Sequence, residues 1–147
     1  LIVMMLTGLL VGWRVESSVV SFLAGVGLLI LFSYAFSWVM SFLGLSVRSP
    51  EIINNASFLI LFPLTFISNA FVPSENLPGP LRVFAEWNPV SALVQAARVL
   101  FGNVAEGSPT ADAWPLQNPV LYVLIFTVVM LVVFVPLSVR KFASLNR

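Results

Sequence analysis

The side chains of this 147-residue chain that are able to do chemistry are few, and the commonest catalytic types are missing. The chain has no histidine and no cysteine, so it offers no Cys/His metal site, no disulfide and no thiol nucleophile. It also lacks a G-x-x-x-x-G-K-[ST] phosphate-binding loop, a G-x-S-x-G nucleophile motif and H-E-x-x-H. We therefore expect no enzyme activity, no catalytic residue, no metal site and no cofactor-binding site in this chain.

Small and hydroxylated residues repeat at helical spacing in the first half of the chain. The members are separated by multiples of four and comprise Ser21, Gly25, Ser33, Ser37 and Ser41. Small residues let helices approach closely, and hydroxyls can hydrogen-bond across the contact. The pattern therefore favours helix packing; the alternative is that Ser33, Ser37 and Ser41 line a translocation path.

A second repeat is aromatic. Phe58, Phe62 and Phe66 also recur at every fourth residue, beside Pro63, which removes a backbone hydrogen bond and favours a kink. Such a stripe is typical of packing or lipid contact, but it also suits a planar, hydrophobic substrate. We keep these three residues as a candidate part of a substrate path.

The composition shows where these elements lie. The chain is 59% hydrophobic and 9% charged, with a mean hydropathy of +1.02, whereas soluble domains are roughly 45–50% apolar and about 25% charged. A soluble globular domain, a coiled coil and a disordered tail are excluded, and a net charge of +1 gives no support to nucleic-acid binding. The sequence therefore predicts a multi-pass protein of the cell membrane.

Apolar runs predict an all-α transmembrane bundle with one partial and three complete spans, at about 1–13, 19–47, 52–72 and 120–138. The first run is shorter than the roughly 20 residues a spanning helix needs, so we expect the chain to begin inside a transmembrane helix. All thirteen charged residues lie outside these spans. Intramembrane carboxylates or histidines are typical of ion-coupled pumps, so the energy for any transport must come from elsewhere.

Basic residues set the expected orientation. Arg140, Lys141 and Arg147 follow the last span, and Arg48 lies in the turn before 52–72, whereas acids outnumber arginines in the loop 73–119. We therefore expect a cytoplasmic C-terminus and turn, and an outer loop 73–119.

The outer loop carries two predicted short helices. Asn88 and Pro89 are typical of a helix start and Gly102-Asn103 of its end. Apolar residues recur between them on one side, with Ser91, Gln95 and Arg98 on the opposite stripe. Upstream, Arg82 and Glu86 form an i,i+4 pair on a second short helix. Such helices re-enter the membrane or lie in its interface; the alternative is an ordinary loop on the headgroups.

The segment 61–98, LFPLTFISNAFVPSENLPGPLRVFAEWNPVSALVQAAR, resembles the C-terminal signature of ABC type 2 transporter permeases. A Leu-Pro pair, an Asn-Pro pair about ten residues later and an arginine nine residues beyond are met by Leu77-Pro78, Asn88-Pro89 and Arg98. Val90 and Ala92 depart from the usual pattern. Within that family the whole chain is most similar to the C-terminal half of the daunorubicin/doxorubicin-resistance (DrrB-like) exporters, through stretches such as LGLSVRSPEIINN and FVPLSVRKF.

This resemblance implies a six-helix permease domain with both termini in the cytoplasm, paired in a homodimer and driven by separate ATPase subunits that bind ATP and Mg²⁺. The chain, 1–147, then holds the end of the third helix to the sixth, with re-entrant helices at 78–101 and the main coupling helix upstream. The turn with Arg48, Pro50 and Glu51 becomes the candidate contact for the ATPase. Otherwise it is a plain positive-inside turn.

We therefore expect the permease subunit of an ATP-driven exporter that moves hydrophobic drugs or lipid-like molecules out of the cell. The outer helix motif, Asn88, Pro89, Gln95 and Arg98, is expected to shape the exit. The alternatives are a non-transporting membrane scaffold or assembly protein, and a permease for lipids or polysaccharides. A channel-like pore has less support because no charged ring or filter motif is visible.

Overall fold

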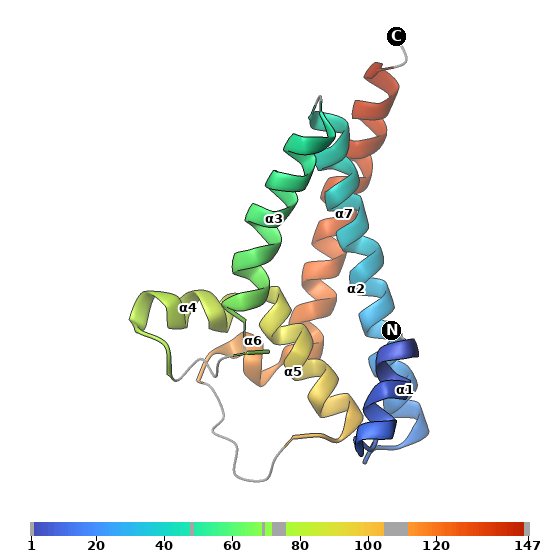
Figure 1. Cartoon of the computed structure of the whole chain (residues 1–147), viewed down its shortest axis with the longest axis vertical. Coiled ribbons are helices and arrows are strands. Elements are labelled where there is room, and N and C mark those ends of the chain that lie inside the picture. The colour runs from blue at the N-terminus through green and yellow to red at the C-terminus, as the bar shows by residue number, and fades with distance from the viewer. Residues whose placement is uncertain (1, 48, 69, 72–75, 105–111, 146–147) are drawn as a thin grey trace.

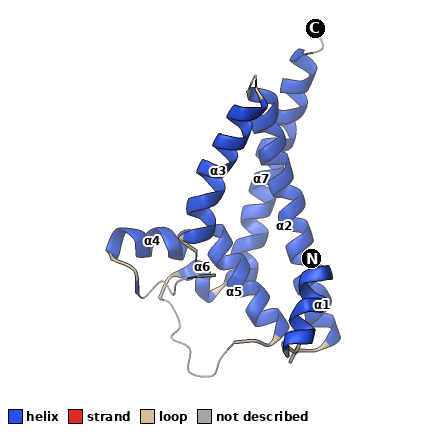
Figure 2. Ribbon diagram, in the orientation of Figure 1, coloured by secondary structure: helices blue, strands red, loops and turns tan. Residues whose placement is uncertain are grey.

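The computed structural model describes residues 2–47, 49–68, 70–71, 76–104 and 112–145, and every regular element in these ranges is a helix (Figure 2). In chain order they are α1 Ile2–Val11, α2 Val19–Ser46, α3 Pro50–Phe66, α4 Gly79–Trp87, α5 Pro89–Phe101, α6 Trp114–Gln117 and α7 Pro119–Leu145. The prediction of an all-α fold is confirmed. The two short helices expected in the outer loop are present as α4 and α5.

The three longest helices, α2, α3 and α7, run along the long axis of the molecule (Figure 1). They come together at the end that carries the α2–α3 turn and the C-terminus, which we call the C-terminal end. At the opposite end, called the α5 end, α4 and α5 lie across the bundle beside α6 and the α1–α2 loop (Figure 1). Toward the α5 end, α3 diverges from α2 and α7.

The buried core joins α2, α5 and α7. It consists of Leu28, Phe32 and Ala35 from α2, Ala92 and Ala96 from α5, and Val123 and Met130 from α7. The three alanines are fully buried, and such small residues let helices approach closely without a gap. None of the described side chains of α3 is buried. The helix that carries the phenylalanine stripe therefore lies outside the core.

Two of the described helices, Val19–Ser46 and Pro119–Ser144, are long and apolar enough to cross a membrane. The predicted span 19–47 is thus confirmed as a helix. α3 has 17 residues, about 25 Å, which is less than the roughly 30 Å of a bilayer core; α1 has 10. The predicted count of three complete spans is not confirmed and stays a prediction.

Two helix ends differ from those expected, and one short helix is additional. The segment 52–72 is helical only as far as Phe66, because its last carbonyls find partners outside the helix and the chain turns at Ile67. The last helix continues past the predicted 120–138 to Leu145, because arginine and lysine at its end are good helix formers. α6, a single turn within the loop 73–119, was not predicted; its four residues carry no helical period.

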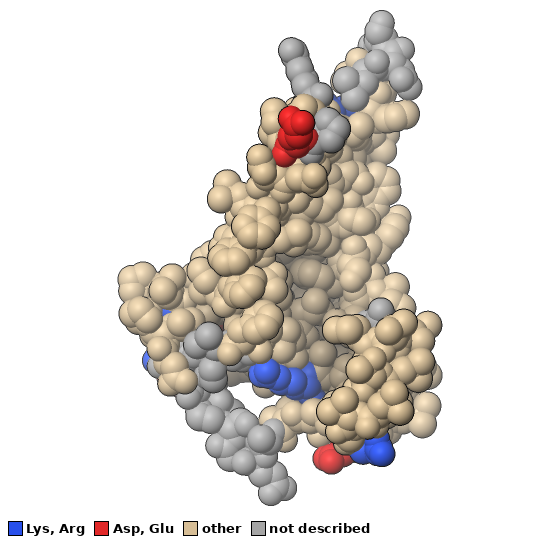
Figure 3. Space-filling model, viewed as in Figure 1, with Lys and Arg blue, Asp and Glu red and all other residues tan. Residues whose placement is uncertain are grey.

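Charged side chains lie toward the two ends of the molecule. On the face shown in Figure 3, the middle of the bundle carries no charge, and the coloured atoms lie at the two ends. Glu51, Arg140 and Lys141 belong to the C-terminal end, while Arg14, Glu16 and the charged residues of α4 and α5 belong to the α5 end. The arrangement matches an uncharged membrane zone between two polar ends. Which end faces the cytoplasm stays a prediction.

Gly25 of α2 lies in close contact with side chains of α5. A Cβ atom added there lies 2.7 Å from the Phe101 Cε1 atom and 3.2 Å from the Leu100 Cβ atom, whereas one added at Gly27 meets nothing within 4 Å. An extra methyl group at position 25 therefore forces Phe101 to move.

We expect Gly25→Ala to destabilise the protein by about 1–3 kcal/mol, which is typical of overpacking. Gly27→Ala is the matched control in the same helix and is expected to leave stability unchanged or raise it slightly, since alanine favours the helix. Thermal unfolding in detergent micelles measures both. Equal midpoints for the two variants contradict the close packing of α5 on α2.

Candidate functional site

Asn88 occupies the junction between α4 and α5 and is 2% exposed. Its side-chain Oδ1 accepts a hydrogen bond from the backbone N–H of Val90 at 2.9 Å. Pro89 follows as the first residue of α5, where a missing N–H costs nothing because that group has no partner within the helix. The predicted helix start at Asn88 and Pro89 is confirmed.

The same side chain also reaches the end of α3. Asn88 Nδ2 donates to the carbonyl oxygens of Leu64 at 2.7 Å and Ile67 at 3.4 Å. The last four carbonyls of a helix have no partner within it, and leaving them unpaired in apolar surroundings is costly. Asn88 therefore closes the end of α3 and the start of α5 with one amide, which fixes the position of α5 relative to α3.

The phenylalanine stripe forms a continuous ladder of rings, with one tilted pair followed by two stacked pairs. The ring centroids of Phe58 and Phe62 are 5.2 Å apart, and those of Phe62 and Phe66 are 4.3 Å apart. Phe71, beyond the end of α3, adds a fourth ring at 5.3 Å from Phe66 with an interplanar angle of 9°. We call these four residues the phenylalanine ladder. The sequence predicted its first three members and missed Phe71.

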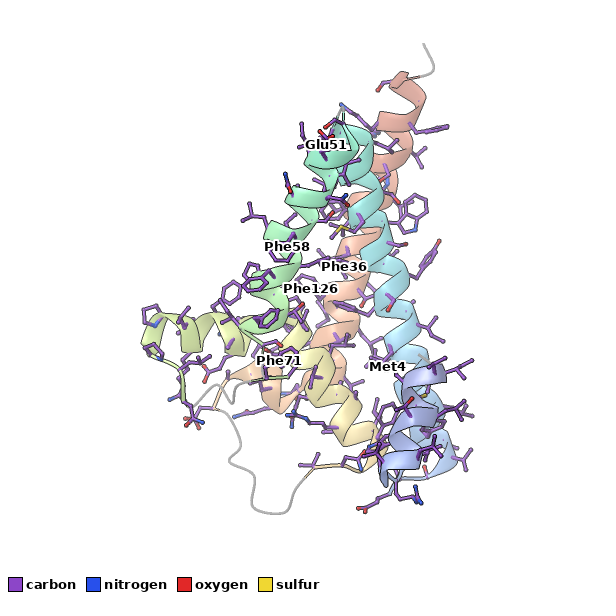
Figure 4. The ribbon with its side chains drawn as sticks, viewed as in Figure 1. Met4, Phe36, Glu51, Phe58, Phe71 and Phe126 are labelled. Carbon is purple, nitrogen blue, oxygen red and sulfur yellow. The ribbon has the colours of Figure 1, made fainter. Side chains whose placement is uncertain are left out.

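The ladder is open to its surroundings. Its members are between 46% and 66% exposed. Figure 4 shows Phe58 at about the level of Phe36 on α2 and Phe126 on α7, while Phe71 lies where the chain passes from α3 toward α4. Exposed stacked rings can receive a further planar ring, lipid chains or another protein surface. Their role in a substrate path stays a prediction.

The serines of α2 do not pack against another described helix. Ser33, Ser37 and Ser41 are exposed, and each hydroxyl donates to a carbonyl of its own helix, at 2.8, 2.6 and 2.8 Å. Gly25, a member of the same series, is buried against α5. The series divides because a step of four residues drifts by about 40° around a helix. Whether the three serines line a path stays a prediction.

α4 turns apolar side chains outward. Its Arg82 Nε and Glu86 Oε1 atoms are 2.7 Å apart, which confirms the predicted pair, and Glu86 is buried. The exposed large side chains of this helix are Leu81, Val83, Phe84 and Trp87. A helix lying on a wet surface shows the opposite pattern, with its charged residues outward. The arrangement therefore favours contact of α4 with lipid.

α5 is covered on more sides than its sequence predicts. The sequence places Ser91 with Gln95 and Arg98 on the stripe opposite the apolar residues, but in the structure Ser91 is buried and the other two are half-buried. The reason is tertiary: α5 packs against both α2 and α7, so two of its faces are enclosed. Gly102 ends the helix with a φ of 76°, as expected of its stop signal.

The α2–α3 turn is only partly described. Arg48 lies outside the described residues. Ser49 caps α3 by accepting from the Ile52 N–H at 3.4 Å, Pro50 is the first residue of the helix, and the exposed Glu51 lies in its first turn. An acid there interacts favourably with the helix dipole. The predicted role of this turn in ATPase contact is untested.

Sequence reasoning missed two long-range contacts. The Tyr122 hydroxyl of α7 donates to the Trp87 carbonyl at 2.7 Å, and the Trp13 indole donates to the Asn103 side chain at 2.8 Å. Each contact joins residues far apart in the chain, so no local sequence pattern predicts it. Within the described part of the chain, no cluster of three acids is present that is able to hold a metal ion.

Comparison with known proteins identifies relatives. A family profile described as "ABC-2 type transporter" matches residues 1–102. The "Daunorubicin resistance ABC transporter permease protein DrrB1" of Streptomyces coeruleorubidus is 31% identical over 139 residues, which cover 95% of this chain and 46% of that protein. The chain thus spans about half the length of this relative. No solved structure matches.

Asn88→Asp separates the two roles of Asn88. The aspartate keeps an oxygen for the Val90 N–H but sets a buried carboxylate oxygen against the Leu64 carbonyl in place of the amide donor, so we expect it to cost more than about 3 kcal/mol of stability. Asn88→Ala removes both bonds without adding a charge and is expected to cost about 1–3 kcal/mol. Asn54→Asp, an exposed site on α3, is the control for the added charge. Thermal unfolding midpoints compare them. An Asn88→Asp protein as stable as the control contradicts the contact with α3.

Proposed function

The chain belongs to the ABC-2 type transporter family, and we propose that it forms part of the membrane-spanning permease of an ATP-driven exporter. The exporter moves hydrophobic drugs or lipid-like molecules out of the cell. The relative from Streptomyces is named for daunorubicin resistance, which supports a drug as the substrate. In this proposal the chain supplies the C-terminal helices of a permease of about twice its length.

A separate ATPase subunit supplies the energy. The predicted spans carry no charged residue, so no ion-coupling group is available within them. ATP and Mg²⁺ bind on the ATPase, and this chain holds no cofactor. The C-terminal end of the bundle faces the cytoplasm by the positive-inside rule, which places the turn with Glu51 on the side of the ATPase.

Other helices cover α3 in the complete transporter. No described side chain of α3 is buried here, although its exposed face includes large phenylalanines. In the membrane this face can meet lipid, helices of the upstream part or a second permease copy. We propose a homodimer in which α3 faces a cavity between the two copies.

The phenylalanine ladder is the observation that carries the substrate class. Four exposed rings in successive contact lead from the middle of α3 toward α4. A planar amphipathic molecule can stack on such rings and move from one to the next without needing a charged partner. The exposed hydroxyls of Ser33, Ser37 and Ser41 face the same cavity from α2 in this proposal and offer weak polar contacts.

The outer helices shape the exit. Asn88 and Pro89 hold the start of α5 against α3, and the half-buried Gln95 and Arg98 lie further along α5. The apolar outward face of α4 also suits a lipid substrate, so a lipid exporter is the second candidate. A non-transporting scaffold does not require an exposed ladder of rings, so we favour the exporter functions over the scaffold.

ATP-dependent dye uptake into inside-out vesicles tests the function. The full-length permease and its ATPase are expected to accumulate a planar fluorescent dye, and an ATPase without its phosphate-binding lysine is expected to give none. Phe62→Ala removes a ring from the middle of the ladder and is expected to lower uptake by about two- to tenfold.

Phe142→Ala is the matched control, because Phe142 is 57% exposed but lies on α7 near the C-terminal end. It is expected to leave dye uptake unchanged. An assembled complex that hydrolyses ATP without moving dye contradicts drug export, and movement of a fluorescent phospholipid by that complex supports the lipid exporter. No ATP-dependent movement of either probe favours the scaffold.

A further inference from the structure

The loop that joins α1 to α2 holds the C-terminal end of α5 through one asparagine. Trp13 Nε1 donates to Asn103 Oδ1 at 2.8 Å, and Asn103 Nδ2 donates to the Arg14 carbonyl at 2.9 Å. Both halves of the Asn103 amide are therefore used, and both partners come from residues about ninety positions earlier. We call these two hydrogen bonds the Trp13–Asn103 contact.

The backbones of the two segments also meet. The Glu16 N–H donates to the Phe101 carbonyl at 3.0 Å. Gly102 has a φ of 76°, and a Cβ atom there lies 2.8 Å from the Glu16 carbonyl carbon and 2.9 Å from the Ser17 nitrogen. Only glycine fits both this backbone conformation and this distance. The close contact between the α1–α2 loop and the end of α5 therefore requires a glycine at position 102.

Aromatic rings fill the space beside these hydrogen bonds. The ring of Phe101 packs edge-on against Trp13, with centroids 5.7 Å apart, and it also contacts Phe22 of α2 at 5.5 Å. Polar and apolar contacts therefore act on the same three consecutive residues, 101–103. This end of α5 is therefore held by the α1–α2 loop and by α2 at the same place.

The other end of α5 is held to α3 in a similar way. Asn88 uses both halves of its amide, one for α5 and one for the Leu64 carbonyl of α3. α3 itself makes few contacts with α2; the Ser57 hydroxyl meets Met40 Sδ at 3.9 Å. α5 is a continuous helix of 13 residues, about 20 Å long, between the two asparagines. A displacement at one end therefore reaches the other.

We propose that Trp13 and Asn103 are positioning residues that make α1, the α1–α2 loop and α5 move as one unit during the transport cycle. α3 follows this unit through Asn88. The inference rests on the proposed export function. It concerns how α1, the α1–α2 loop and α5 move together when the ATPase drives the permease. Neither residue needs to touch the substrate.

Fluorescence quenching tests the contact without measuring transport. A bimane label on Val104→Cys, a 45% exposed position next to Asn103, is placed in a cysteine-free full-length permease bound to its ATPase. We expect Trp13 to quench the label equally with no nucleotide, with ATP and with trapped ADP-vanadate, and Trp13→Phe to relieve the quenching. Quenching that is lost on ATP binding, or that persists in Trp13→Phe, overturns the proposal.

Efflux measurements test the positioning role. Trp13→Phe keeps a ring against Phe101 but removes the N–H donor, and Asn103→Asp removes the donor to the Arg14 carbonyl. Each is expected to lower ATP-dependent dye transport by about fivefold at equal membrane abundance, the scale of one hydrogen bond. The double variant is expected to transport dye as well as the less active of the two single variants, since both substitutions act on one contact.

Trp114→Phe is the matched control, because Trp114 is an exposed tryptophan at the same end of the bundle whose ring contacts Tyr122. It is expected to transport like the wild type. Full transport by the double variant refutes the positioning role and leaves export intact. A wild-type complex that shows the quenching but no ATP-dependent transport refutes the export function, and with it the role assigned here, while the contact itself stands.

Discussion

The end of α3 poses the physical problem on which the rest of the structure depends. A helix that ends in apolar surroundings leaves carbonyl groups that water does not reach, and each needs a partner from elsewhere in the chain. Asn88 supplies that partner for Leu64 while its other side-chain atom caps α5. One buried amide thus joins the end of α3 to the start of α5, which runs across the bundle. Without it, the Leu64 carbonyl loses its partner from α5, and the direct hydrogen bond between these two elements is lost.

This constraint divides the molecule into a packed part and an open part. α2, α5 and α7 share a buried core with three fully buried alanines, whereas α3 contributes no buried side chain among its described residues. The open part carries the phenylalanine ladder. In an export permease this division is useful, because a surface that receives substrate must stay accessible while its support stays rigid.

Local features of the fold follow from the sequence, and tertiary ones do not. Asn88, Pro89 and Gly102 mark the limits of α5, and Arg82 pairs with Glu86, because each depends on residues within one helical turn. The burial of Ser91 and the outward apolar face of α4 depend on which helices come to lie beside them. Contacts such as Trp13 with Asn103 join segments that no periodicity relates. The residues alone predict a multi-pass membrane protein, whereas the permease of an ATP-driven exporter was predicted from the family resemblance.

In the proposed orientation, α4 and α5 lie on the outer side of the membrane while the C-terminus lies in the cytoplasm. Single cysteines in place of Val104 and Ser144, in an otherwise cysteine-free full-length permease, report this directly through labelling of intact cells by a membrane-impermeant maleimide. Both positions are exposed. This orientation predicts labelling at 104 from outside and at 144 only after the membrane is opened. Labelling of 144 in intact cells, or of 104 only after opening, contradicts it.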